Sequence, residues 1–484
     1  MQSISSFSYN QIKNNGGKEE ERKMLAEPSV SVLGLDPTHR NCVLNGNAFQ
    51  QDAIQSFNGW QYASFYSYLS AEAAHEPLYI HLSRRKLPEG KWETLVFEDY
   101  PQTTDDGHNT VQVGICPGDG TIHLSYDHHC DRIRYRHSQP GIAHSPDSFP
   151  WSPSLFTPHL SRLPGLGEEH DDLLSYVTYP RFVQLDRALL FSFRTGKAGL
   201  GDDHLAVYGP RRQHGTYGYT VLGTNLKGVE NNPYIHGLDV RSSSSGGESS
   251  YRLHATWVYR GFVWYPGWDD RRDTQHKQQR GPNSAENNHD ICYAYSDDGG
   301  RTWRNGAGDV VADLARGESV RPDAPGIVAF EIPRGSGLSN QEAQAVDHEG
   351  GVHVLNRDAV DGTQRWKHYY RSPKGLWTQR ALPHVQGVRG GKRGRLAVSK
   401  DGDLYLVLPD NAAPVLTILK ATKASGYAKY ELVWRETGFP PTEPLVDTTR
   451  LDYDNVLSVF TRSSNAADIE SNPHVDVVVL DFKL

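Results

Sequence analysis

The stretch Thr110-Val-Gln-Val-Gly-Ile-Cys-Pro-Gly-Asp-Gly-Thr-Ile-His-Leu-Ser-Tyr-Asp127 contains two short runs rich in apolar residues at alternate positions, separated by a Gly-Asp-Gly turn. Alternation with a period of two is typical of β-strands, and a glycine-rich turn between two such runs is typical of a hairpin. The stretch therefore predicts two antiparallel strands joined by a tight turn.

The same pattern recurs along the chain at intervals of roughly 45 to 60 residues, which is the signature of a β-propeller. Similar hairpins or strand sets are expected near residues 60–100, 178–194, 234–303, 342–355, 395–408 and 450–484. We therefore predict an all-β fold, a seven-bladed β-propeller that forms a single catalytic domain over residues 31–484. A polar N-terminal arm is expected over residues 1–30, and residues 41–50 are expected to add a strand to the last blade and close the ring.

An octapeptide gives independent support for the propeller. Ser296-Asp-Asp-Gly-Gly-Arg-Thr-Trp303 fits the SxDxGxTW pattern of an Asp box, a turn between the outer strands of a blade. Its carboxylate and hydroxyl can accept hydrogen bonds from turn amides, and its tryptophan can pack between sheets. We expect this motif to be structural and assign it no chemistry.

Composition and charge restrict the possible partners. The 484 residues carry a net charge of −8, and 10% of them are aromatic, with 46 glycines and 2 methionines, as suits short strands joined by turns. The chain lacks the basic field that phosphate binding needs, so no nucleic acid is expected. No window approaches the ~20 apolar residues needed to cross a bilayer, so no membrane is expected. We expect a monomer. The four scattered cysteines are too few for a disulfide scaffold, so unpaired thiols are expected for most of them, and one disulfide stays open.

Propeller geometry selects the residues that can form a site. Residues before the first strand of a blade and after its second strand collect on one face of the ring. On this argument one rim holds histidines, tyrosines, arginines and amides: His108, Asn109, His128, His129, Tyr179, Arg194, Tyr234, His236, Arg260, Asn340, Gln341, Arg357, Arg393 and Arg450.

This set of side chains suits an anionic sugar. The planar guanidinium of arginine can bind a carboxylate through two hydrogen bonds, and tyrosine and histidine can transfer protons. A lone histidine pair without an evident third ligand is a weak zinc signal. We therefore expect no cofactor in the chemistry, and no metal is assigned beyond a possible structural Ca²⁺.

Several runs carry a resemblance to a known family: Asp106-Gly-His-Asn-Thr110, Asp127-His-His129, Thr178-Tyr-Pro-Arg-Phe182, Phe193-Arg-Thr-Gly196 and Val352-His-Val-Leu-Asn-Arg357. Over residues 59–482 the chain resembles the BNR-repeat propeller family. That family includes ulvan lyases, rhamnosidases of arabinogalactan side chains, and L-rhamnose-α-1,4-D-glucuronate lyases that act on gum arabic, to which the resemblance is closest.

The resemblance implies a polysaccharide lyase that acts by β-elimination on an acidic plant or algal polysaccharide outside the cell. In the related lyases an arginine neutralises the uronate carboxylate while a histidine and a tyrosine exchange protons with the sugar. The positions that look like these are His108, His128 or His129, Tyr179 and Arg194, and which group is base and which is acid stays open. Asn109, Tyr234, His236, Arg260, Asn340, Gln341, Arg357 and Arg393 are expected to bind substrate.

Three other functions stay open on the sequence. An α-L-rhamnosidase would hydrolyse the same linkage, but hydrolysis usually needs two carboxyl groups flanking the bond, and no clear pair is expected across the funnel. An ulvan lyase would share the chemistry and differ in substrate. A sugar-binding propeller without catalysis would need no proton donor or acceptor.

Overall fold

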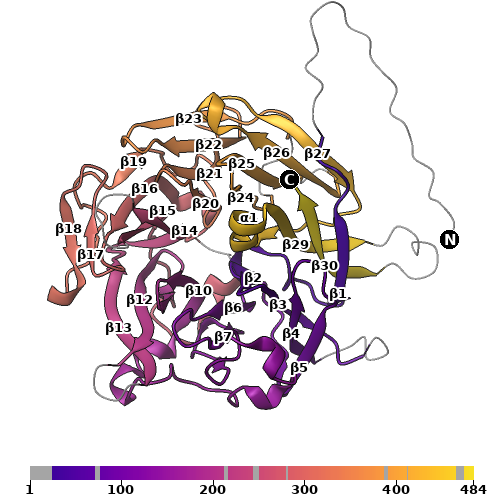
Figure 1. The fold of residues 1–484 in the computed structure, drawn as a ribbon. Coiled ribbons are helices and arrows are strands. Elements are labelled where there is room, and N and C mark those ends of the chain that lie inside the picture. The colour runs from indigo at the N-terminus through magenta and orange to yellow at the C-terminus, as the bar shows by residue number, and fades with distance from the viewer. Residues whose placement is uncertain are drawn as a thin grey trace, which may run out of the picture.

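The computed structural model describes residues 24–70, 77–211, 216–243, 250–278, 282–385, 391–410, 413–464 and 474–484. Within these residues, seven antiparallel sheets surround a central axis like the blades of a propeller (Figure 1). The predicted all-β, seven-bladed architecture is thereby confirmed.

The blades follow one another along the chain. Blade 1 contains β2 (Ile54–Phe57), β3 (Trp60–Ser67), β4 (Leu78–Lys86) and β5 (Glu93–Gln102). Blade 2 contains β6 (Val111–Ile115), β7 (Ile122–Tyr126) and β9 (Tyr135–His137). Blade 3 contains β10 (Val177–Leu185), β11 (Ala188–Lys197), β12 (Leu200–Pro210) and β13 (Tyr217–Leu226), with β8 (His129–Asp131) paired to β10.

The remaining blades complete the ring. Blade 4 contains β14 (Asn231–Ser243), β15 (Ser250–Gly261), β16 (Asn288–Ser296), β17 (Thr302–Arg304), β18 (Val310–Asp313) and β19 (Val328–Phe330). Blade 5 contains β20 (Ala343–Val346), β21 (Val352–Asp358), β22 (Arg365–Arg371) and β23 (Trp377–Ala381), and blade 6 contains β24 (Arg395–Val398), β25 (Leu404–Pro409), β26 (Val415–Ala421) and β27 (Glu431–Thr437). Blade 7 contains β28 (Leu445–Val446), β29 (Val456–Ser464), β30 (Val475–Lys483) and β1 (Ser29–Leu35).

Short helices lie in the connections. The α-helix α1 (Thr448–Asp454) lies near the axis of the ring in Figure 1. The 3-10 turns are η1 (Ala48–Gln50), η3 (Pro146–Ser148), η4 (Pro153–Leu155), η5 (Glu168–His170), η6 (Leu173–Ser175), η7 (Gln275–Gln278), η8 (Ala285–Asn287), η9 (Leu314–Arg316) and η10 (Lys423–Ser425). No helix in the described ranges has the length and apolar character needed to cross a membrane.

The ring closes differently from the expectation. Residues 41–50 do not form a strand; they run as a loop that ends in η1. The closing strand is β1, which pairs antiparallel with β30 from Ser29 opposite Asp481 to Leu35 opposite Asp476 (Figure 1). The alternating Ser-Val-Ser-Val sequence of β1 suits an edge strand that is only half covered.

Aromatic side chains fill the space between neighbouring blades. Trp257, Trp303 and Trp366 are among the largest fully buried side chains. Blades 2 and 3 approach so closely that a Cβ atom on Gly114 would lie 2.4 Å from Cγ of Phe182, so only glycine fits there. The sheets of blades 2 and 3 are therefore in close contact at this position.

The Asp box forms as expected. Oδ1 of Asp298 accepts hydrogen bonds from the backbone amides of Arg301 and Thr302, at 3.1 and 2.8 Å, while the Trp303 side chain is buried. The four cysteines are all free, as was expected for most of them.

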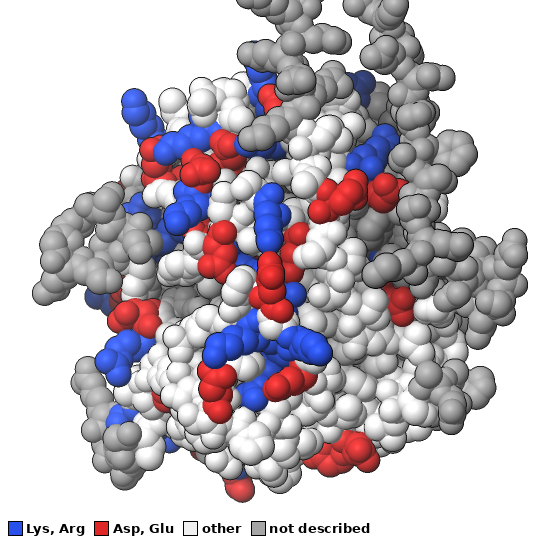
Figure 2. Space-filling model, turned by 45° about the vertical axis from the view of Figure 1, so that its right-hand side comes forward, with Lys and Arg blue, Asp and Glu red and all other residues white. Residues whose placement is uncertain are grey.

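Surface charge is mixed on the face shown in Figure 2, where Lys and Arg side chains lie among Asp and Glu side chains. The expectation that Arg450 lies on the rim of the candidate site is wrong. Arg450 lies on α1, 2.7 Å from Asp481, and lines a cavity together with Pro117 and Asp186. These two residues belong to the turns β6–β7 and β10–β11, at the end of the ring opposite to the candidate site.

Candidate active site

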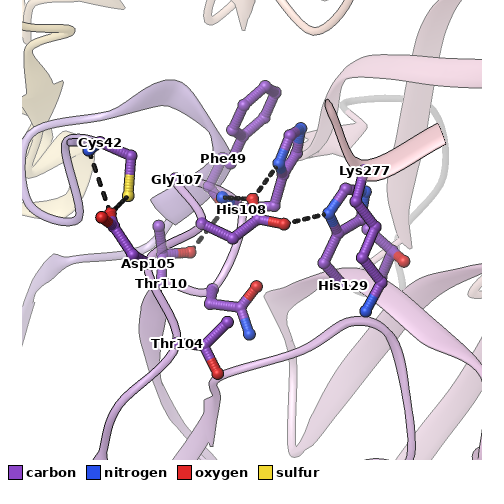
Figure 3. A network of polar contacts seen from close by, with 12 residues as sticks. Cys42, Phe49, Thr104, Asp105, Gly107, His108, Thr110, His129 and Lys277 are labelled. Carbon is purple, nitrogen blue, oxygen red and sulfur yellow. Dashed lines mark hydrogen bonds and ion pairs between the residues drawn. The ribbon is translucent and has the colours of Figure 1, made fainter. Parts of the chain in front are cut away.

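Asp106 lies between two histidines, His108 and His129, and bonds to both of them; the two histidines are labelled in Figure 3. Its Oδ1 atom is 2.6 Å from Nδ1 of His108, and its Oδ2 atom is 2.7 Å from Nδ1 of His129. The two imidazole rings are stacked, with centroids 3.9 Å apart. His108 precedes β6 and His129 follows β7, and the pairing of Val111 with Tyr126 brings these two ends of the hairpin together.

The charge on Asp106 fixes the state of both histidines. Burial opposes ionisation of this carboxyl, but hydrogen bonds from His108 and His129 outweigh burial and lower its pKa. An ionised carboxylate can only accept hydrogen bonds, so each Nδ1 carries the hydrogen and each Nε2 keeps its lone pair. Burial and the neighbouring His108 also lower the pKa of His129 well below its usual range. His129 is therefore a neutral imidazole whose Nε2 atom can accept a proton, and His108 is held beside it by the same carboxylate.

Tyr179 reaches this pair because β10 is bulged at its start. Thr178 pairs with His129 of β8 on one side and with Arg194 of β11 on the other, and the register with β11 shifts directly after Thr178. Tyr179 has a φ of 55°, in the left-handed region that is strained for a tyrosine. A bulge redirects side chains, and here it brings the phenol ring within 5.7 Å of the His108 ring, centroid to centroid.

Tyr179 keeps its proton at neutral pH. Burial raises the pKa of its hydroxyl, although the nearby Arg194 acts in the opposite direction. The guanidinium carbon of Arg194 lies 4.7 Å from the Tyr179 ring and 5.3 Å from the ring of Tyr234. Tyr179 is therefore a buried phenol that can donate a proton beside a cation.

Arg194 is a buried cation without an anionic partner. Its side chain is 2% exposed and donates to Oδ1 of Asn232 at 3.0 Å, while its Nε has no hydrogen-bond partner. Within the residues that the structure describes, no carboxylate forms an ion pair with it. Arg260, which is equally buried, bonds to Oδ1 of Asn288 and lies over Tyr234. Buried charges are normally paired, so this part of the cavity suits an anionic ligand.

A groove extends from this cluster across the ring. Phe49 stacks on His108, with ring centroids 4.4 Å apart. The guanidinium carbon of Arg393 lies 4.8 Å from the centroid of the same Phe49 ring. Phe49, Asn340, Arg357 and Arg393 line a groove of about 1050 Å³. The positive charges of both arginines in the groove are neutralised by ion pairs. Arg357 pairs with Glu342 at 2.6 Å, and Arg393 pairs with Glu443 at 2.9 Å.

The structure brings most of the expected site residues together. His108, His129, Tyr179, Arg194, Tyr234 and Arg260 form one cluster over blades 2, 3 and 4. Gln341 lines a small cavity with Tyr179 and Tyr234, whereas Asn340, Arg357 and Arg393 lie along the groove. Asn109 is buried next to His108 in the chain and donates to Oδ1 of Asp127 at 2.9 Å.

Two expected residues are not part of the cluster. His128 points into blade 2, where its Nε2 lies 3.3 Å from the Arg134 carbonyl, because successive residues point in opposite directions. His236 is fully buried between blades, and its Nδ1 accepts a hydrogen bond from the Glu342 amide at 3.1 Å. Burial lowers the pKa of each of these two histidines to about 3, so they remain neutral structural groups.

The sequence placed Asp106 on the predicted face without giving it a role, and it did not single out Phe49 as a member of the site. Asp106 had a usable signal, since it lies two residues before His108 in the segment expected at the rim. Phe49 had none, because it lies in the 41–50 segment that was expected to be a strand.

A metal site was tested against the same geometry. Asp106, His108 and His129 are the one group of three potential ligands found within 4.8 Å of one another in the described part of the chain. Both Asp106 oxygens already hold the two Nδ1 atoms, which leaves two Nε2 atoms where zinc sites use three or four protein ligands. The arrangement fits a pair of oriented bases better than a metal centre.

Comparison with known proteins links this geometry to a family. The model of a family described as "BNR repeat-containing family member" matches residues 60–385. Two curated relatives, both named ulvan lyase, long isoform, come from Alteromonas sp and Pseudoalteromonas sp. (strain PLSV). Each is 22% identical over 341 residues, covering 63% of this chain and 31% of the relative. The chain thus spans about a third of the length of the curated relatives it matches.

Among solved structures, the crystal structure of polysaccharide lyase Uly1 is similar over the whole ring. The TM-score is 0.62 at 16% sequence identity, and the match covers 96% of this chain and 100% of that chain. At this identity the similarity establishes the fold.

Proposed function

The chain belongs to the BNR repeat-containing family, and from this premise we propose that it is a polysaccharide lyase that acts by β-elimination at a glucuronate residue. The observation that carries the proposal is the unpaired guanidinium of Arg194 beside the imidazoles held by Asp106. A buried cation next to an imidazole base is the combination that removal of a proton α to a carboxylate needs.

The elimination can be assigned to this chain's own side chains. Arg194 binds the uronate carboxylate and neutralises the charge that develops as the C5 proton leaves. An Nε2 atom of the His108–His129 pair accepts that proton, and the electrons of the C5–H bond form the C4–C5 double bond. The C4–O4 bond breaks, and the Tyr179 hydroxyl protonates the departing O4.

We propose an acidic plant polysaccharide such as gum arabic arabinogalactan as the substrate, with cleavage at the L-rhamnose-α-1,4-D-glucuronate linkage outside the cell. The products are then free rhamnose and a chain that ends in a 4,5-unsaturated uronate. The resemblance of the site motifs supports this linkage, whereas the names of the curated relatives support ulvan as the competing substrate.

One incubation experiment tests the reaction and the substrate together. The full chain is incubated with gum arabic and, separately, with ulvan, while free rhamnose and the ultraviolet absorbance of the conjugated unsaturated uronate are followed. We expect absorbance and rhamnose to rise together with gum arabic. Rhamnose release without absorbance would identify a hydrolase, and absorbance with ulvan alone would replace the proposed linkage.

A further inference from the structure

In the connection between β15 and β16, residues 262–278 lie next to the His129 side of the site. Lys197, which is buried, holds its start by donating to the carbonyls of Trp268 and Asp270 at 2.5 and 2.6 Å. Lys277 holds its middle through an ion pair with Asp131 at 3.4 Å, and Figure 3 shows Lys277 beside His129. These contacts fix η7 against blade 3.

His276, in η7, turns its ring toward the site. The ring is edge-on to His129, with centroids 6.0 Å apart, and lies 6.5 Å from the ring of Tyr176. The residue is 6% exposed, yet neither ring nitrogen has a hydrogen-bond partner among the described residues. A buried polar group without a hydrogen-bond partner destabilises the fold, so these two ring nitrogens are expected to form hydrogen bonds with a bound ligand.

Other unpartnered polar atoms lie at the same place. Nε of Arg194 and Nδ2 of Asn232 are both buried without a partner, although the two side chains bond to each other. The strand pairing places Arg194 near His276, since Thr178 pairs with Arg194 on one side and with His129, the ring neighbour of His276, on the other. Unpartnered donors beside an uncompensated guanidinium match a ligand that carries hydroxyl groups as well as a carboxylate.

The protonation state of His276 suits a hydroxyl group. Burial, together with the positive charges of Lys197 and Arg194, lowers its pKa to about 4. At neutral pH the ring therefore offers one donor and one acceptor, which is also what a sugar hydroxyl offers.

We infer that His276 is a substrate-binding residue: one ring nitrogen donates a hydrogen bond to a hydroxyl of the uronate whose carboxylate Arg194 binds, and the other accepts one from a second hydroxyl of the same substrate. This inference rests on the proposed function, since it assumes a uronate at Arg194. It assigns η7, which packs against blade 3, a role in substrate specificity.

The test uses the full chain, with elimination followed on gum arabic and D-glucuronate binding followed by calorimetry. In His276→Ala we expect KM to rise and glucuronate affinity to fall by about 5- to 10-fold, as suits the loss of a hydrogen bond to a neutral group, with kcat little changed. His276→Asn keeps one donor and one acceptor and should recover part of the affinity. Arg272→Ala, on the same connection, is the matched control and should match the wild type, since among the described residues the Arg272 side chain bonds only to Asp270.

The outcomes separate this inference from the proposed function. Equal affinity of His276→Ala and the wild type for glucuronate would overturn the inference, whatever the activity. Glucuronate binding that depends on His276 in a protein that eliminates nothing would support the inference and overturn the lyase assignment. Absence of glucuronate binding by the wild type would overturn the inference.

Discussion

At the residue scale, Arg194 is the side chain on which the proposed reaction depends most. Lysine in its place keeps the charge but loses the planar fork that binds a carboxylate and stacks between Tyr179 and Tyr234. We expect Arg194→Lys to lower kcat/KM by about 10²-fold or more. The measurement is the initial rate of absorbance increase with gum arabic.

The control for this substitution is Arg241→Lys. Arg241 pairs with Asp452 of α1, near the opposite end of the channel, so the same exchange there should leave kcat/KM unchanged. An Arg194→Lys variant as active as the wild type would show that no carboxylate binds at this position.

Asp106 is expected to act on the reaction through the histidines it orients. In Asp106→Asn one amide oxygen can still accept from one Nδ1–H, but the amide nitrogen faces the other histidine and favours the opposite tautomer. We expect kcat to fall by about 10²-fold or more, because a base of the wrong tautomer has no lone pair at Nε2.

The pH profile gives Asp106→Asn a second readout. In the wild type burial and His108 lower the pKa of His129, and Asp106 acts against them. An imidazole base is active when unprotonated, so kcat/KM should hold until the pH falls below the usual histidine range. Without the Asp106 charge the pKa falls further, so the acid limb of the variant should move to lower pH. An acid limb that moves to higher pH would contradict the assignment of a histidine base.

At the element scale, the strands that carry alternation were predictable and the irregular ones were not. The β6–β7 and β24–β25 hairpins follow directly from alternating residues around Gly-Asp turns. The bulge in β10 has no comparable signal, since Tyr179 adopts a left-handed backbone that its side chain disfavours. The choice between His128 and His129 depends on the pairing of β8 with β10, which is a contact between distant segments. The local sequence pattern therefore identified most of the residues that the structure brings together, but it could not predict the direction in which each side chain points.

At the same scale, the Asp box can be tested for a role that is structural and not catalytic. Asp298→Ala removes the acceptor of the Arg301 and Thr302 amides, so we expect a loss of about 1 kcal/mol in the free energy of unfolding. The neighbouring Asp297→Ala breaks only a partly exposed ion pair with Arg252 and should cost less. Denaturant unfolding measures both. A fall in kcat/KM of folded Asp298→Ala would mean that the motif does more than hold its turn.

At the scale of the whole molecule, the sequence predicted a closed ring but assigned its closure to the wrong segment. The 41–50 segment, which contains Phe49, was expected to add the closing strand, whereas the Ser-Val alternation of 29–35 lies at the edge of the segment expected to be a polar arm. In the structure, residues 29–35 pair with β30. Residues 41–50 form a loop instead, and this loop places the Phe49 ring on the His108 ring. The closure of the ring and the construction of the site are therefore connected through the N-terminal segment.

This arrangement predicts that stability and activity respond differently to removal of β1. A chain that begins at residue 36 loses the pairing with β30 and the contacts of the half-buried Leu33 and Leu35 with the core, so we expect a loss of about 2 kcal/mol or more and a lower unfolding temperature. The uncovered edge of β30 is also expected to promote aggregation, which light scattering would detect. A chain that begins at residue 24 keeps β1 and is the matched control. Because blades 2 to 4 carry the reacting groups, the shorter chain should keep its kcat/KM below its unfolding temperature, and a specific loss of activity while folded would place the N-terminal segment in the site itself.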